Sequence, residues 1–261
     1  MTPGATTSES DGRGARQGQT LAIVLCAGQG SRMGAAQNKI FLPLAGMPVG
    51  ARAIGVFQDS PLVDEILVMA HPLEVQRVRE ELIAPYHFAK VSGVAAGGAS
   101  RHQSEERALE VVRERIASGD IGLVMIHDGA RPLVTGHEIA RLVTAIRASP
   151  RPGGALLATR VAPDERIAQV GADGLLEHVF SAGELARAQT PQGFDALALL
   201  AAYDHARREG IEGTDTASVV EAAGGLVVVV AGDEANLKVT TPDDLLRAEA
   251  ILRARGTSTT S

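Results

Sequence analysis

The sequence has only one cysteine, Cys26, among its 261 residues, so no disulfide can form within one chain. A chain without disulfides is typical of a reducing compartment. No apolar run approaches the length of a membrane-spanning helix, and the N-terminal segment has no apolar signal core. These absences predict a soluble, cytoplasmic protein with no membrane partner.

The sequence also lacks an excess of positive charge: 31 acidic residues outnumber 25 lysines and arginines, and the formal net charge is −6. Binding along a nucleic acid needs an excess of cations to neutralise phosphates, so we expect no nucleic-acid partner and only a local phosphate site. Lysine is scarce, because Lys39, Lys90 and Lys238 are the only three. They either mark places that need a compact ammonium group or reflect coding bias.

Two well-known phosphate-binding motifs are absent. Gly28, Gly30 and Gly34 follow the first apolar run as GxGxxxG, not as the dinucleotide-binding GxGxxG, and no Gly-Lys-Ser or Gly-Lys-Thr is present. The loop nevertheless carries Arg32, and Lys39 follows it. Glycines let backbone N–H groups approach phosphate oxygens, and two cations can meet the charge on a phosphorus under attack. This pattern favours a triphosphate site over the structural alternative, a plain strand-to-helix turn.

Apolar runs alternate with helical patterns along most of the chain. This alternation predicts an α/β fold with a mostly parallel sheet, helices on both faces and ligands at the carboxyl ends of the strands. We expect one domain over residues 20–255 between disordered tails at 1–19 and 256–261. The expected strands are 20–26, 65–70, 89–95, 122–127, 154–161 and 226–230, and the expected helices are 48–58, 73–83, 101–118, 136–148, 194–209, 216–223 and 242–254.

Residues 165–180 interrupt this alternation. Residues 166–170 and 175–180 have the pattern of two strands, with a tight turn at 171–174. The hairpin lies within a β-arm of about residues 161–188. Because an isolated two-stranded sheet is marginal in water, we expect the arm to pack on a second subunit or back on its own domain.

Two segments follow expected strands. In GGASRHQS, residues 97–104, small residues would let a flat base lie against the backbone while Ser104 contacts its polar edges. The alternative is an ordinary turn with Ser100 as a helix N-cap. In HDGARP, residues 127–132, Asp128 is placed to hold Mg²⁺ together with substrate phosphates, or else pairs with Arg131 to stabilise the loop. We interpret His127 as structural.

Four polar residues lie further along the chain. Thr190 and Thr214 could donate hydroxyls to a small polyol phosphate, or could cap helices. Lys238 would face the phosphates from the side opposite the glycine loop, and Asn236 could add an oxygen ligand to the metal.

The order of these segments resembles one family. The glycine loop with Arg32 and Lys39, then GGxxRxxS, HDxARP, TPQ, TD and NxKVTxPxDL, is similar to the 2-C-methyl-D-erythritol 4-phosphate cytidylyltransferases of the non-mevalonate isoprenoid pathway, over roughly residues 20–253. The resemblance implies a Rossmann-like nucleotidyltransferase fold and a homodimer whose β-arms clasp each other. It also implies that, with Mg²⁺, CTP and the sugar-alcohol phosphate give 4-diphosphocytidyl-2-C-methyl-D-erythritol and pyrophosphate.

The resemblance and the residue patterns together assign candidate roles, and two of the three lysines receive one. The catalytic candidates are Arg32, Lys39 and Lys238; the nucleotide-binding candidates are Ala27, Gly28, Gly30, Gly98 and Ser104; the substrate-binding candidates are Arg131, Thr190 and Thr214; and the metal-binding candidates are Asp128 and Asn236.

The match is incomplete at the arm. The family offers an Asp-Thr pair and an arginine from the arm to the neighbouring subunit's substrate phosphate, whereas this chain has Ala162-Pro163 and Ala182. Arg160, Arg166 or Arg187 could compensate. The altered arm leaves open a second acceptor, for instance ribitol 5-phosphate. A non-catalytic nucleotide-binding paralogue is a further alternative.

Overall fold

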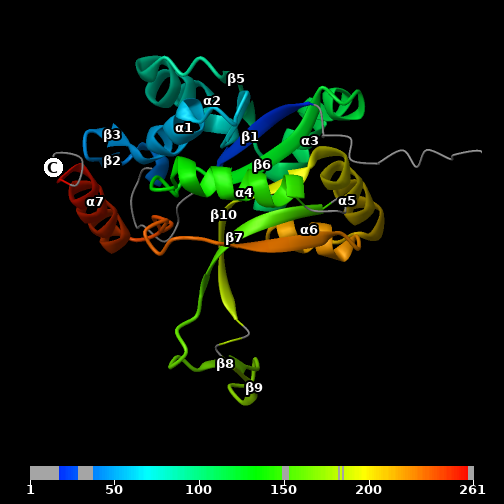
Figure 1. Cartoon of the computed structure of the whole chain (residues 1–261). Helices are drawn as coiled ribbons and strands as arrows, with labels where there is room; N and C mark the ends of the chain where they lie inside the picture. The colour runs from blue at the N-terminus through cyan, green and yellow to red at the C-terminus, as the bar shows by residue number, and fades with distance from the viewer. Residues whose placement is uncertain (1–17, 29–37, 149–152, 182, 184, 258–261) are drawn as a thin grey trace, which may run out of the picture.

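A seven-stranded sheet forms the centre of the computed structural model, which describes residues 18–28, 38–148, 153–181, 183 and 185–257 (Figure 1). The strand order is β11-β7-β10-β6-β1-β4-β5. Only β10 runs antiparallel to its neighbours, β6 and β7, so the predicted mostly parallel sheet is confirmed. The strands are β1 (Gln19–Cys26), β4 (Glu65–Ala70), β5 (Val91–Ala96), β6 (Ile121–Asp128), β7 (Gly153–Arg160), β10 (Ala186–Asp195) and β11 (Leu226–Ala231).

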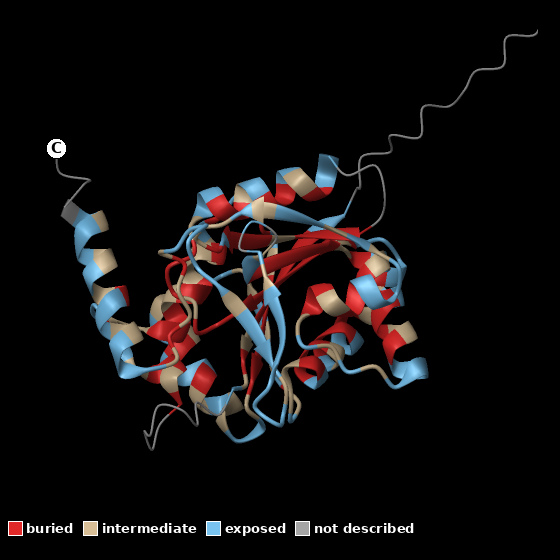
Figure 2. Cartoon of the chain, turned by 90° about the horizontal axis from the view of Figure 1, so that it is seen from below, coloured by how far each residue is buried: buried red, intermediate tan, exposed pale blue. Residues whose placement is uncertain are grey.

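Helices cover both faces of the sheet, as the alternating pattern predicts. On one face, α1 (Val49–Asp59) and α4 (Gly136–Ala148) pack into one apolar cluster with the sheet. On the other face, α3 (Arg101–Ala117), α5 (Ala196–Glu209) and α6 (Thr216–Ala222) form a second cluster. Figure 2 shows that the helices turn their buried sides inward toward the buried strands. The two clusters fix the sheet, and so they fix the loops at its edges.

A third, smaller cluster lies beside the carboxyl edge of the sheet. The C-terminal helix α7 (Pro242–Thr257) packs against the short hairpin of β2 (Pro43–Leu44) and β3 (Met47–Pro48). Val239 is fully buried in this cluster, and its N–H donates to the Ala130 carbonyl at 2.8 Å. The cluster therefore anchors the backbone on either side of Lys238.

The segment expected as a single helix over residues 73–83 is broken into short pieces. It contains η3 (Pro72–Glu74), the four-residue α2 (Val75–Val78) and a π-helical turn η4 (Arg79–Ile83), followed by η5 (Ala84–Tyr86). Pro85 has no N–H to donate, which prevents a regular helix from continuing beyond η4 into residues 84–86.

The strand β10 is absent from the sequence-based expectations. We expected no strand between residues 181 and 193 and a helix from Phe194, but β10 continues to Asp195 and α5 begins at Ala196. Gln189, Thr190, Pro191, Gln192 and Gly193 are residues that usually mark loops. They occur in a strand here because neighbouring segments satisfy their buried polar groups; for example, Gln192 donates to Asp215 and accepts from Ala217.

The expected hairpin is present as a separate two-stranded sheet. β8 (Ile167–Val170) pairs antiparallel with β9 (Leu176–Phe180), and Gly174 takes a positive φ of 81° in the turn between them. Figure 1 shows the hairpin projecting from the body, below the ends of β7 and β10.

Residues 19, 256 and 257, which we expected in the disordered tails, belong to a strand and a helix. β1 already begins at Gln19, and α7 extends to Thr257. Residues 1–17 and 258–261 lie outside the described residues. Within the described part of the chain, no helix has the length and apolarity needed to cross a membrane.

Candidate active site

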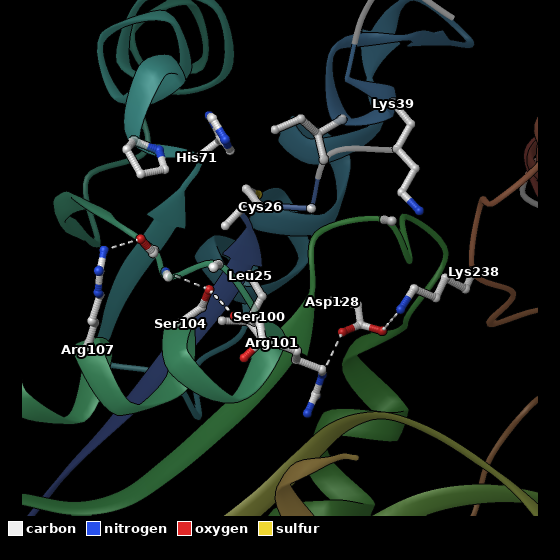
Figure 3. A pocket seen from close by; sticks show the side chains of 18 residues that line it. Leu25, Cys26, Lys39, His71, Ser100, Arg101, Ser104, Arg107, Asp128 and Lys238 are labelled. Atoms are coloured by element: carbon white, nitrogen blue, oxygen red, sulfur yellow. Dashed lines mark hydrogen bonds and ion pairs between the residues drawn. The ribbon is translucent and has the colours of Figure 1, made fainter. Parts of the chain in front are cut away.

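A cavity of about 480 Å³ opens at the carboxyl edge of the sheet (Figure 3). Its walls come from the ends of β1 and β6 and from the loops after β4 and β5, together with the segments around Lys39 and Lys238. This is the place where parallel α/β sheets bind ligands. Seven of the sequence-predicted site residues line the cavity: Ala27, Gly28, Lys39, Gly98, Ser104, Asp128 and Lys238.

The glycine loop is described only at its beginning. Ala27 and Gly28 follow β1 and line the cavity. A Cβ atom at Gly28 would meet no atom of the described residues within 4 Å, so these residues leave open space beside the Gly28 backbone. Gly30 and Arg32 lie outside the described residues.

Lys39 begins a short 3-10 helix, η2 (Lys39–Phe41), and two features hold it in place. Ile40 and Phe41 are buried in the core, and the Asn38 side chain accepts from the Ile40 N–H and donates to Glu74 at 2.7 Å. These contacts fix the backbone that presents Lys39. Figure 3 shows the Lys39 and Lys238 ammonium groups directed toward the same side of the cavity.

The turn between β5 and α3 is formed by close packing. A Cβ atom at Gly98 would lie 2.3 Å from the Gln103 Cβ and 2.9 Å from its carbonyl carbon, so only glycine fits. The Ser100 side chain accepts from the Gln103 N–H at 3.1 Å, which confirms that Ser100 is the N-cap of α3. Ser104 is buried; its Oγ accepts from the Gly98 N–H at 3.0 Å and donates to the Ser100 carbonyl at 2.9 Å. Ser104 therefore shapes the turn as well as lining the cavity.

Three cations surround the Asp128 carboxylate. Lys238 Nζ lies 2.8 Å from Oδ2, Arg131 Nε lies 3.7 Å from Oδ2, and Arg101 Nε lies 3.5 Å from Oδ1. Burial alone would raise the pKa of Asp128, but Lys238 and Arg101 hold that pKa well below its usual range. Asp128 is therefore ionised. Because three cations surround this one carboxylate, this part of the site carries a net positive charge, which suits an anionic ligand.

A chain of hydrogen bonds fixes the loop after β6. The Asp128 N–H donates to Thr190 Oγ1 at 3.0 Å, and Thr190 Oγ1 lies 3.2 Å from His127 Nδ1. The other ring nitrogen of His127, Nε2, lies 3.0 Å from the Arg131 carbonyl oxygen. Burial lowers the pKa of His127 to about 4, so the ring is neutral near pH 7 and bridges the two polar groups. These contacts agree with the interpretation of His127 as structural.

Four predicted residues do not line this cavity. Thr190 is buried in the chain of contacts with His127, and Arg131 donates to the Asn236 carbonyl at 2.7 Å. The Asn236 side chain is fully buried and donates to the Thr190 carbonyl at 3.0 Å. Thr214 is exposed, and the N-cap of α6 is Asp215, not Thr214. The helix-cap alternatives for Thr190 and Thr214 are therefore wrong.

Several cavity residues were missed. His71 and Pro72 follow β4, Arg107 donates to the Gly97 carbonyl, and Arg101 contacts Asp128. Arg101 stands in the GGxxRxxS segment, but nothing in the sequence gave it a role. Its place four residues before Glu105, on the same side of one helix, was the available signal.

Cys26 lines the cavity but is not a suitable nucleophile. The thiol is buried, and burial raises its pKa to about 12, so the reactive thiolate is scarce near neutral pH. The charged groups that line the cavity in the described residues are four cations, Lys39, Arg101, Arg107 and Lys238, and one carboxylate, Asp128. Such a set binds and polarises phosphates without forming a covalent intermediate.

The fold and the site define an α/β nucleotidyltransferase. The family model described as 2-C-methyl-D-erythritol 4-phosphate cytidylyltransferase (IspD) matches residues 20–254. The chain belongs to this family.

Individual relatives agree with this assignment. A 2-C-methyl-D-erythritol 4-phosphate cytidylyltransferase of Geobacter metallireducens is 39% identical over 90% of this chain and 98% of its own length. The enzyme of the same description from Clostridium acetobutylicum is 38% identical over 89% of this chain and 96% of its own. The crystal structure of the Francisella tularensis enzyme of this description is similar with a TM-score of 0.73 at 28% identity, covering 89% of this chain and 99% of that one.

Proposed function

We propose that this chain transfers the cytidylyl group of CTP to 2-C-methyl-D-erythritol 4-phosphate. The products are 4-diphosphocytidyl-2-C-methyl-D-erythritol and pyrophosphate, in the synthesis of isoprenoid precursors. The observation that carries the proposal is that the family match over residues 20–254 contains every segment that lines the cavity.

The proposed reaction is an in-line displacement. An oxygen of the acceptor phosphate forms a bond to the α-phosphorus of CTP while the bond from that phosphorus to the bridging oxygen breaks, and pyrophosphate leaves. A phosphate monoester is mostly ionised near pH 7, so the reaction needs no general base. Catalysis then consists of positioning and charge stabilisation, for which Arg32, Lys39 and Lys238 are the candidate cations.

We propose that the nucleotide occupies one side of the cavity. In the proposed complex, the backbone at Ala27 and Gly28 lies against the triphosphate, and the Gly98 turn with Ser104 lies against the cytidine. The open space at Gly28 and the closely packed turn at Gly98 support this placement.

The donor set fits Mg²⁺ through one carboxylate. Mg²⁺ is usually bound by one or two carboxylates together with substrate phosphates, and Asp128 provides one ionised carboxylate at the cavity wall. In the described residues, no three His, Cys, Asp or Glu side chains are grouped closely enough to hold a metal on their own. Asn236 is a weaker candidate, because its buried side chain faces Glu138 and Thr190. When bound, Mg²⁺ would neutralise part of the triphosphate charge.

The proposed contacts to the acceptor come from the sequence. Arg131, Thr190 and Thr214 stay candidate acceptor contacts, and a homodimer through the β-arm and a cytoplasmic location stay predictions. Of the arm cations that could replace the family's phosphate contacts, Arg187 pairs with Glu165 at 2.6 Å, whereas Arg166 donates to backbone carbonyls of its own loop.

The test is pyrophosphate release by the purified protein with CTP and Mg²⁺. 2-C-methyl-D-erythritol 4-phosphate and ribitol 5-phosphate are supplied in parallel. We expect release with the first acceptor only. Release with ribitol 5-phosphate alone would show that the acceptor is a different polyol phosphate from the one proposed. Measurable CTP binding without release in either reaction would favour the non-catalytic alternative.

A further inference from the structure

A buried carboxylate lies directly behind the cavity, and the proposed chemistry gives it no role. Glu105 is on α3, one turn after Arg101, and only 1% of its side chain is exposed. Glu105 lies on the buried side of this helix, in line with the core residues Leu109, Val112 and Ile116. A charged residue in such a position requires partners for its charge and for its hydrogen-bonding capacity.

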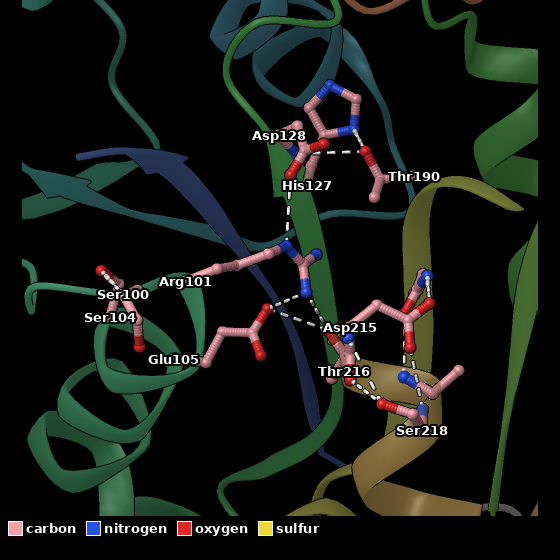
Figure 4. Close-up of polar contacts among 12 residues, drawn as sticks. Ser100, Arg101, Ser104, Glu105, His127, Asp128, Thr190, Asp215, Thr216 and Ser218 are labelled. Carbon is pink, nitrogen blue, oxygen red and sulfur yellow. Dashed lines mark hydrogen bonds and ion pairs between the residues drawn. The ribbon is translucent and has the colours of Figure 1, made fainter. Parts of the chain in front are cut away.

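Donors from three helices satisfy the Glu105 carboxylate. Oε1 lies 2.5 Å from Arg101 Nη1 and accepts from the Thr216 hydroxyl at 3.0 Å, and Oε2 accepts from the Tyr203 hydroxyl. Arg101 also donates to Thr216 Oγ1 at 3.2 Å. Figure 4 shows the guanidinium group between Glu105 and Asp128. The ionised form of Glu105 is thus fully hydrogen-bonded, and α3, α5 and α6 hold it in one place.

The two carboxylates share Arg101 unequally. The guanidinium lies 2.5 Å from Glu105 but 3.5 Å from Asp128, and the longer distance is at the limit of a hydrogen bond. Because Glu105 lies nearer than Asp128 to the Arg101 guanidinium, Oδ1 of Asp128 keeps capacity for an incoming group. Without the contact to Glu105, Arg101 would be free to close on Asp128 and compete with a ligand for it.

We infer that Glu105 is a positioning residue: by holding the Arg101 guanidinium away from Asp128, it keeps the Asp128 carboxylate available to a divalent cation that enters with the nucleotide. The inference deepens the proposed function and rests on it. Glu105 touches neither substrate nor metal, and it acts only through Arg101.

The main test is Glu105→Gln, which keeps the size and an acceptor oxygen but removes the charge. We expect kcat for pyrophosphate release to fall about tenfold while the KM for CTP stays within about twofold. Calorimetry without acceptor gives a second readout: the gain in CTP affinity on adding Mg²⁺ should shrink about fivefold. Glu105→Asp, which retains the charge, should recover most of both effects.

The matched control is Glu106→Gln, one residue further on the same helix. Glu106 pairs with Arg207 at 3.4 Å, away from the cavity, so neither readout should change. A Glu105→Gln protein with lowered thermal stability but wild-type kcat and wild-type Mg²⁺ dependence would overturn the inference and leave Glu105 as a core residue only.

A second comparison applies even if Glu105→Gln fails to fold. The double variant Arg101→Gln, Glu105→Gln carries no unpaired buried charge, and it should match Arg101→Gln alone in kcat and in Mg²⁺ dependence. A further loss in the double variant would contradict action through Arg101. If the wild-type protein binds CTP but releases no pyrophosphate, the proposed function fails, whereas the calorimetric comparison still tests the inference.

Discussion

The carboxyl edge of the sheet and the β-arm contain similar residue types in opposite environments. At the carboxyl edge, three cations surround the buried Asp128, and core residues flank the described segments that carry Lys39 and Lys238. On the arm, the Arg187–Glu165 pair is about half exposed, and an exposed pair of this kind contributes little stability. Val170, Leu176 and Val179 are also exposed there. The described residues at the carboxyl edge are thus organised within one chain, whereas the described part of the arm has no buried core of its own.

The largest effect should come from the cavity wall. Lys39→Ala should lower kcat for pyrophosphate release by about 10²–10³-fold, because it removes a cation that faces the developing charge. The fold should persist, since buried Ile40 and Phe41 anchor this segment. Lys90→Ala is the matched control: its ammonium donates to the Ser60 carbonyl at 2.7 Å and does not line the cavity. Near-normal turnover of Lys39→Ala would remove this residue from the mechanism.

The second-largest effect should come from the arm, through which we predict that two copies of the chain form a dimer. Val179→Asp should raise the dimer dissociation constant about a hundredfold, because an apolar interface would have to bury an unpaired carboxylate. Analytical ultracentrifugation of the wild type and of Val179→Asp measures the two dissociation constants. Leu246→Asp on α7 is the control, because Leu246 is equally a large exposed apolar residue but lies outside the arm. An unchanged constant for Val179→Asp would show that the arm does not form the contact.

Two glycines at the cavity should separate folding from binding. Gly98→Ala should lower the free energy of unfolding by about 1–3 kcal/mol, because its Cβ would overlap Gln103. Gly28→Ala should leave stability unchanged, since no atom of the described residues lies within 4 Å of its Cβ, and should weaken CTP binding about tenfold. Denaturant titration and calorimetry measure the two quantities. Equal stability losses in both variants would contradict this distinction.

A further effect of about tenfold should arise from adding a positive charge to the arm. Ala182→Arg should lower the KM for 2-C-methyl-D-erythritol 4-phosphate about tenfold, the value of one charge-assisted phosphate contact. Ala172→Arg, in the hairpin turn, adds the same charge elsewhere on the arm and should leave KM unchanged. If both variants behave like the wild type, the arm does not reach the acceptor.

Much of the fold followed from the sequence because its strands and helices are strongly patterned. The predicted bounds of β4 and α4 agree with the structure at both ends. β10 was missed, since its loop-like residues are satisfied by contacts distant in the sequence, such as Gln189 with the Asp233 carbonyl. Tertiary contacts of this kind override local preference.

The cavity residues could be predicted from the sequence where a glycine-rich loop, a scarce lysine or an aspartate at a strand end marks them. Gly28, Lys39, Asp128 and Lys238 all line one cavity, although they come from four separate segments. Glu105 was not found, because a glutamate in a helix rich in Glu and Arg resembles an exposed residue. Only its spacing to Leu109 and Val112 indicated that it lies on the buried side.

The most direct test of the central claim is a crystal structure of the protein with CTP and Mg²⁺. We predict that the triphosphate lies in the cavity, within hydrogen-bonding distance of Lys39 Nζ and Lys238 Nζ, with the cytosine beside the Gly98 turn. A triphosphate bound elsewhere, or one that leaves both lysines without phosphate contacts, would contradict the claim that this edge of the sheet is the nucleotide site.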